Sequence, residues 1–273
     1  MLKQRVITAL LLIPFVIAVI FAAPAAWFLT LSAIVLLGCS WEYGHLAGVS
    51  SRPVRYILTL AQAVIFATLF WYKDHWATDI LLYLSICCVV WLMLFIRLPF
   101  YRPDTQLNNT YRLISVATAI LSITTGWFAL GWIRLQPEGS WLILLLLLIV
   151  WAADTGAYFS GKAFGKRKLA AHISPGKTRA GLLGGLVAAT LVALVAANLM
   201  PLESIEPLPL VLLSLLTALV SVGGDLMISL HKRTSGIKDS GNLLPGHGGM
   251  LDRLDSLLAA APFFALGLLV SGA

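Results

Sequence analysis

Apolar residues occur along this chain in runs of about twenty, separated by short polar segments, and a helix of about that length crosses the hydrocarbon core of a bilayer. The pattern therefore predicts an all-α polytopic membrane protein. We expect nine membrane-spanning helices, at about residues 6–23, 27–46, 55–72, 77–96, 113–133, 141–161, 181–200, 208–230 and 254–271.

The first apolar run resembles a secretory signal, because Lys3 and Arg5 precede it and small residues follow at 22–26. We nevertheless expect it to remain as a span. It has full membrane length, and the second run begins directly after it.

Composition agrees with lipid as the solvent. Hydrophobic residues make up 59% of the chain and charged residues 11%, whereas a soluble domain carries about 25% charged residues. So few charges cannot cover a water-soluble fold of this size.

The basic residues test the nine-span pattern independently, because Lys and Arg accumulate in short cytoplasmic loops. With a cytoplasmic N-terminus, 17 of the 19 basic residues fall on that side, and Lys73 and Arg134 fall on the other. The pattern predicts a cytoplasmic N-terminus and a periplasmic C-terminus in a bacterial inner membrane.

The net charge of +7 therefore follows from topology and from contact with anionic lipids, and it does not predict nucleic-acid binding. Cys39, Cys87 and Cys88 fall within apolar runs without metal-ligand spacing. We interpret them as packing residues rather than as redox or zinc ligands.

The chain divides by polarity into two parts of one membrane unit. Residues 1–140 combine spans with short loops, whereas residues 141–273 contain two longer polar loops near 162–180 and 231–253, both on the predicted cytoplasmic side. We expect the chemistry in this second, catalytic part.

Two acids begin the last predicted span. Asp252 and Asp255 are three residues apart, so a helix places them on one face, where both can reach one ion. Carboxylates of this kind suit Mg²⁺. Alternatively, they complement the positive N-terminal dipole of the helix.

Two further acids lie within spans. Asp225 follows Gly223 and Gly224 near the predicted cytoplasmic end of its span, and Asp154 occupies a comparable position in the sixth span. A carboxylate at membrane depth is costly and usually faces a partner or a wet cavity. Together with the loop acids, these residues predict a metal or phosphate site.

A glycine-rich segment, 246–249, precedes the last span and could wrap its amides around an anionic oxygen. Within it, Gly248 and Gly249 are candidate phosphate contacts, and His247 could donate to a phosphate or a leaving group. Glycines also serve ordinary turns, so the neighbouring acids give the segment its significance.

Basic residues accompany these acids, and Lys or Arg in such a setting binds phosphate. Lys238 lies in the middle of the loop beside Asp239, which favours phosphate contact over topology. Arg253 is a second candidate. Lys232 and Arg233 directly follow a span, so orientation and phosphate binding explain them equally well.

The 162–180 loop contains Gly176, Lys177 and Thr178, which resemble the end of a nucleotide-binding P-loop. That motif needs glycine where Ala171 stands and a preceding strand, and we expect neither. A P-loop ATPase is therefore excluded, while Lys177 and Thr178 remain phosphate-binding candidates.

The whole pattern resembles that of the phosphatidate cytidylyltransferases, also called CDP-diacylglycerol synthases. The matching residues run from Ser229 through Lys232-Arg233, Lys238-Asp239, Pro245 to Gly249 and Asp252-Arg253-Leu254-Asp255, with further likeness at Asp154 to Tyr158, Phe164 to Lys166 and Ser174 to Thr178. The likeness covers roughly residues 150–265. Three positions depart from the pattern: His231, Ile228 and Ala180.

The resemblance implies that CTP and phosphatidate give CDP-diacylglycerol and pyrophosphate, in service of phospholipid biosynthesis. It implies Mg²⁺ held by Asp225, Asp252 and Asp255, with Lys238 and His247 among the catalytic residues. The implied substrate-binding residues are Asp154, Ser174, Lys177, Thr178, Lys232, Arg233, Asp239, Gly248, Gly249 and Arg253. A second cation, monovalent or divalent, and a homodimer stay open.

Two other classes of protein compete with this interpretation. An ion-coupled transporter also places acids inside spans, but near the middle of the membrane and in broken helices. A lipid-binding scaffold accounts for the basic face but not for the grouped acids. The clustering at one interface favours the enzyme.

Overall fold

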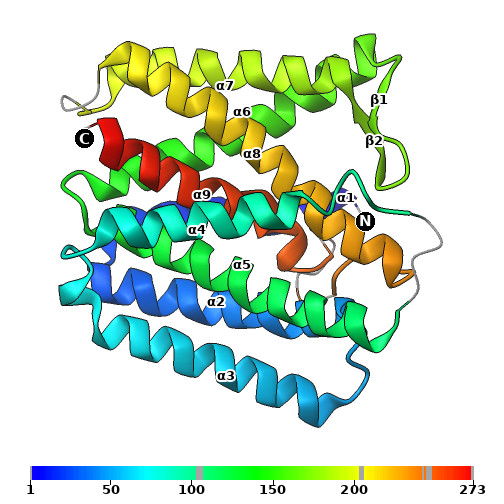
Figure 1. The fold of residues 1–273 in the computed structure, drawn as a ribbon. Coiled ribbons are helices and arrows are strands. Elements are labelled where there is room, and N and C mark those ends of the chain that lie inside the picture. The colour runs from blue at the N-terminus through cyan, green and yellow to red at the C-terminus, as the bar shows by residue number, and fades with distance from the viewer. Residues whose placement is uncertain (1, 103–106, 203–205, 242, 244–247, 272–273) are drawn as a thin grey trace.

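The computed structural model describes residues 2–102, 107–202, 206–241, 243 and 248–271. A helix occupies each of the nine predicted ranges (Figure 1). The helices are α1 (Leu2–Ala22), α2 (Ala25–Leu46), α3 (Arg52–Trp71), α4 (Ile80–Phe95), α5 (Asn109–Leu135), α6 (Gly139–Phe164), α7 (Arg179–Leu199), α8 (Pro207–Thr234) and α9 (Leu251–Ser271), with a short 3₁₀ helix, η1 (Lys73–His75), before α4.

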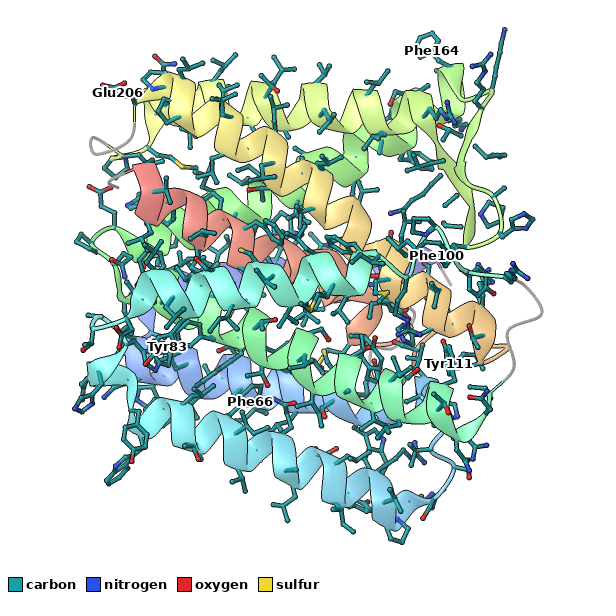
Figure 2. All side chains as sticks on the ribbon, viewed as in Figure 1. Phe66, Tyr83, Phe100, Tyr111, Phe164 and Glu206 are labelled. Atoms are coloured by element: carbon teal, nitrogen blue, oxygen red, sulfur yellow. The ribbon has the colours of Figure 1, made fainter. Side chains whose placement is uncertain are left out.

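Seven of these helices, α2, α3 and α5 to α9, are long and apolar enough to cross a membrane. The apolar stretches Leu12–Ala22 in α1 and Ile80–Phe95 in α4 are shorter. The outer surface of the bundle carries many apolar side chains (Figure 2). The protein is therefore a helical, polytopic membrane protein.

Consecutive helices run in opposite directions, so the connections alternate between the two ends of the bundle (Figure 1). One end, on the right in Figure 1, holds the N-terminus and the connections α6–α7 and α8–α9; we call it the hairpin end. The opposite end holds the end of α9, the 3₁₀ helix that contains Lys73 and the last turn of α5, which contains Arg134. Both long polar loops thus lie at the same end, as the alternation of spans predicted.

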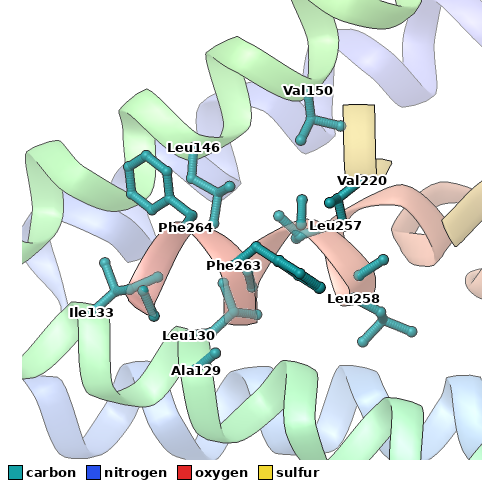
Figure 3. Packing of buried hydrophobic residues seen from close by; sticks show 14 of the residues in the cluster. Ala129, Leu130, Ile133, Leu146, Val150, Val220, Leu257, Leu258, Phe263 and Phe264 are labelled. Atoms are coloured by element: carbon teal, nitrogen blue, oxygen red, sulfur yellow. The ribbon is translucent and has the colours of Figure 1, made fainter. Parts of the chain in front are cut away.

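Helix α9 lies in the middle of the bundle, in contact with α2, α4, α5, α6 and α8. Its side chains pack in several directions, with Phe264 near Leu146 of α6 and Phe263 near Leu130 of α5 (Figure 3). Phe264 and Leu258 are fully buried. Surrounded in this way, α9 is fixed relative to five other helices.

The 162–180 loop forms a β-hairpin, which the sequence did not predict. Strand β1 (Lys168–Ala170) pairs antiparallel with β2 (Ser174–Thr178), with Lys168 opposite Thr178. Pro175 is accommodated because a two-stranded hairpin consists of edge strands alone. The expectation that no strand precedes Lys177 was therefore wrong. The two antiparallel strands still lack the strand–loop–helix arrangement of a P-loop.

Two close helix crossings depend on glycine. A Cβ on Gly156 of α6 would lie 2.6 Å from the carbonyl oxygen of Gly184 in α7. A Cβ on Gly224 of α8 would lie 2.6 Å from the carbonyl oxygen of Asp255 in α9. Small residues at such crossings let membrane helices pack backbone to backbone. The second crossing brings Asp225 beside the first turns of α9.

We expect Gly224→Ala to destabilise the protein by about 1–3 kcal/mol, because the added methyl group would force α8 and α9 apart. Intrinsic helix propensity predicts the opposite, a gain of about 1 kcal/mol. Unfolding in mixed detergent micelles would measure the change, with Leu219→Ala on the exposed face of α8 as the control. A Gly224→Ala variant at least as stable as the wild type would contradict the close crossing.

Candidate active site

An ion pair joins the hairpin to α8. Lys177 Nζ of β2 lies 2.7 Å from Asp225 Oδ2, and the Ser229 hydroxyl donates to Asp225 Oδ1 at 3.0 Å. The Lys177 ammonium is enclosed, and its contact with Asp225 is an ion pair without aligned hydrogen-bond geometry. The ion pair thereby holds the hairpin against the half of α8 that the sequence predicts to face the cytoplasm.

Lys177 also interacts electrostatically with two other acids, Asp154 of α6 and Asp255 of α9. Asp255 is buried in the α8–α9 crossing, where its carboxylate accepts from the Ser256 amide at 2.7 Å. Asp255 also interacts with Lys232 of α8, so carboxyl groups from three helices lie around two ammonium groups.

A cavity of about 330 Å³ opens around this group. Its lining includes Asp154, Tyr158, Ser174, Lys177, Thr178 and Asp225. A second cavity, of about 520 Å³, shares Leu169, Leu182 and Val222 with the first and has a mostly apolar lining, with His172 at its hairpin side. Polar and apolar space therefore adjoin at the hairpin end.

Asp252, in the first turn of α9, has a second set of partners. Lys232 Nζ donates to its Oδ1 at 2.8 Å, while the amides of Ser240 and Gly249 donate to its Oδ2 at 2.9 and 3.2 Å. The Asp252 side chain is only 10% exposed. The acid thus joins the end of α8, the α8–α9 loop and the start of α9.

The proposed metal ligands do not form one compact group. Among the residues that the structure describes, no three His, Cys, Asp or Glu side chains gather closely enough to hold an ion. Asp225 and Asp252 contact different lysines, whereas Asp225 and Asp255 lie on either side of the α8–α9 crossing. The structure brings Asp154, Asp225 and Asp255 around Lys177 and keeps Asp252 with Lys232.

Sequence reasoning missed Glu42, which lies near the end of α2. Its carboxylate is 3% exposed and accepts hydrogen bonds from Ser240 and from the amides of Met250 and Leu251. The rule that singled out Asp225, an acid at the end of an apolar run, applies equally to Glu42. It would have identified this residue.

Two predicted phosphate ligands also have structural roles. The Thr178 hydroxyl is the N-cap of α7 and accepts from the Gly181 amide at 3.0 Å. Arg233 Nε donates to the carbonyl oxygen of Ile173 at 3.1 Å, which attaches α8 to the turn of the hairpin. Ser174 lines the polar cavity beside them.

The remaining candidates lie in the α8–α9 loop and at the start of α9. Lys238, Asp239 and Arg253 are exposed at the hairpin end. Gly248 has a φ of +82°, in the left-handed region that favours glycine. His247 lies outside the described residues.

The departures from the family pattern have local explanations. His231 is fully buried; its Nδ1 lies 2.9 Å from the Met227 carbonyl oxygen and its Nε2 lies 3.4 Å from an Arg97 nitrogen. Because Arg97 can only donate, Nε2 is the acceptor and Nδ1 carries the proton. Ile228 is buried in the core, and Ala180 lies in the first turn of α7.

Comparison with known proteins gives a consistent result. A model described as "Cytidylyltransferase family" matches residues 3–270. Over its full length the chain is 42% identical to a phosphatidate cytidylyltransferase of Pseudomonas aeruginosa, covering 98% of that protein. It is 38% identical to the enzyme of the same name from Haemophilus influenzae, with 97% of this chain and 98% of that protein aligned. A Bacillus subtilis relative of that name is 47% identical over 48% of each chain.

We expect Thr178→Val to lose about 1 kcal/mol of stability, because the first turn of α7 loses its cap. Thr178→Ser keeps the accepting hydroxyl and should retain the stability of the wild type. Unfolding of both variants in mixed micelles compares them directly. Equal stability of the Ser and Val variants would show that the cap does not stabilise the first turn of α7.

Proposed function

The chain belongs to the cytidylyltransferase family, and from this premise we propose that it transfers CMP from CTP to phosphatidate, giving CDP-diacylglycerol and pyrophosphate. The observation that carries the proposal is the set of lysine–carboxylate pairs at the hairpin end, Lys177 with Asp225 and Lys232 with Asp252. The Lys177–Asp225 pair lines a cavity that shares three lining residues with a mostly apolar one.

The adjoining cavities suit a substrate with two kinds of surface. The polar cavity offers Lys177 and Ser174 to a phosphate, while its apolar neighbour offers Leu169 and Leu182 to acyl chains. We expect the water-soluble nucleotide to approach from the same end of the bundle, where Lys238, Asp239 and Arg253 are exposed. The phosphatidate headgroup and CTP can therefore meet while the acyl chains stay in the lipid and the nucleotide stays in water.

The donor set fits Mg²⁺ as the cofactor. Mg²⁺ takes oxygen ligands, and it is commonly held by one or two carboxylates together with substrate phosphates rather than by an all-protein cage. Asp225 and Asp252 would hold it, with Asp255 in support beside Asp225. When bound, Mg²⁺ would neutralise charge on the triphosphate and on departing pyrophosphate.

In the reaction, an oxygen of the phosphatidate phosphate forms a bond to the α-phosphorus of CTP, and the bond from that phosphorus to the bridging oxygen of pyrophosphate breaks. The second pKa of a phosphate monoester is about 6, so the nucleophile is largely ionised at neutral pH and needs no strong base. Alignment and neutralisation of charge then supply the rate enhancement.

The lysines are placed to exchange partners during this reaction. Lys177 and Lys232 neutralise carboxylates in the structure, and either ammonium can turn to a phosphate when a cation takes its place. Arg253 and Lys238 would contact the outer phosphates from their exposed positions. The Gly248 amide would bind a phosphate oxygen, and the Gly249 amide, which donates to Asp252 in the structure, would join it once Asp252 holds a cation. His247 would assist the leaving group.

We further propose that the nine helices all span a bacterial inner membrane, with the hairpin end in the cytoplasm, where CTP is available. The concentration of basic residues at that end supports this orientation. Asp252 and Asp255 lie in the first turns of α9, at the hairpin end, and this position supports an enzyme over a transporter.

We expect Asp252→Asn to reduce Mg²⁺-dependent formation of CDP-diacylglycerol by about a hundredfold or more, since electrostatic stabilisation at the phosphates would be lost. Labelled CTP and phosphatidate in mixed micelles provide the assay. Asp74→Asn, an exposed acid at the opposite end, is the matched control and should retain full activity. Near-normal turnover by Asp252→Asn would overturn the metal assignment.

The orientation has a separate test. In intact spheroplasts, a membrane-impermeant maleimide should label Asp74→Cys and leave Ser50→Cys unlabelled until the membrane is opened, because the two exposed positions lie at opposite ends of the bundle. Cys39, Cys87 and Cys88 are buried and should contribute little background. The reverse labelling would place the hairpin end outside.

A further inference from the structure

Glu42 is a buried acid from the N-terminal part of the chain that contacts the α8–α9 loop. The Ser240 hydroxyl donates to its Oε2 at 2.9 Å, the Met250 amide to its Oε1 at 3.1 Å and the Leu251 amide to its Oε2 at 2.9 Å. Ser240 and Met250 flank the segment 241–249. One carboxylate therefore joins the residues on either side of this segment.

Glycine is required on both sides of that carboxylate. A Cβ on Gly241 would overlap Glu42 Oε1, and a Cβ on Gly249 would lie 2.6 Å from Glu42 Oε2. The backbone of both residues therefore passes directly against the carboxylate. No larger residue at either position leaves room for Glu42 where it lies.

The charge of Glu42 is balanced by a helix terminus. Among the described side chains, no cation lies within ion-pair distance of its carboxylate. Its partners are instead the Met250 and Leu251 amides at the start of α9, where the helix dipole is positive. Helix α2 thus supplies the acid that caps α9.

Glu42 shares this loop with Asp252. Asp252 Oδ2 accepts from the Ser240 and Gly249 amides, while Glu42 accepts from the Ser240 hydroxyl. Ser240 is therefore held by both carboxylates at once, through its backbone and through its side chain. A substitution at Glu42 would therefore shift the position of Asp252, because Ser240 and the first turn of α9 connect the two residues.

We propose that Glu42 is a positioning residue of the transferase: it fixes Ser240 and Met250, on either side of 241–249, so that Asp252 and the Gly248 amide are presented together to the CTP phosphates. This inference rests on the proposed function. Glu42 does not line the cavity around Lys177, so its effect should fall on CTP rather than on phosphatidate.

The central test is Glu42→Gln, which keeps the size of the side chain but places an NH₂ group against backbone N–H donors. We expect the KM for CTP to rise by about ten- to a hundredfold, as expected for the loss of charge-assisted hydrogen bonds, with the KM for phosphatidate unchanged. Glu206→Gln, the same substitution at an exposed position at the opposite end, should change neither constant.

Ser240→Ala supplies a milder variant that removes one of the three hydrogen bonds to Glu42. It should raise the KM for CTP in the same direction by a smaller factor, and it keeps the inference testable should Glu42→Gln fail to fold. Equal losses for CTP and phosphatidate in these variants, or an unchanged KM for CTP, would overturn the positioning role.

Amide hydrogen exchange separates this inference from the proposed function. Glu42→Gln should accelerate exchange at Met250 and Leu251, whereas Glu206→Gln should not. A wild-type protein that makes no CDP-lipid would reject the proposed function even with this exchange effect present. An active wild type together with unchanged exchange in Glu42→Gln would reject the role of Glu42 alone.

Discussion

An ionised carboxylate near the edge of a bilayer is stable only when its oxygens have partners, and the hairpin end of this bundle is arranged around that constraint. Asp225 has Lys177 and Ser229, Asp252 has Lys232 and two amides, and Glu42 has a hydroxyl and two amides. These partners come from different elements. Satisfying the acids therefore joins α2, α8, α9 and the hairpin into one unit.

The kind of partner differs between these acids, and the difference corresponds to their proposed roles. Glu42 accepts hydrogen bonds from a hydroxyl and from two backbone amides, which are fixed in position. Such partners suit a residue that holds the start of α9 in place. Asp225 and Asp252 are paired with lysines, whose flexible stems can carry the charge elsewhere. Acids with exchangeable cations are suited to bind and release a metal–nucleotide complex in each turnover.

Close packing of the helices sets the distances at this site. Gly224 lets the backbone of α8 approach that of α9 at Asp255, and Gly156 does the same between α6 and α7. Because apolar association between helices is weak in lipid, such contacts and the interhelical polar pairs are what fix the bundle. The adjoining polar and apolar cavities follow from this arrangement, with the hairpin as a shared wall.

The sequence by itself determined the nine helical ranges, the location of both polar loops at one end and the presence of an acid, Asp225, within an apolar span beside Gly224. Those features depend on the length and spacing of apolar runs, which are local properties of the chain. Only the tertiary structure decided the hairpin, the pairing of Lys177 with Asp225 and the role of Glu42, which is 198 residues from Ser240. A buried charge must be paired with a donor, because leaving it unpaired is energetically unfavourable. Which donor is close enough depends on how the helices pack across the whole bundle, and this is not a local property of the chain.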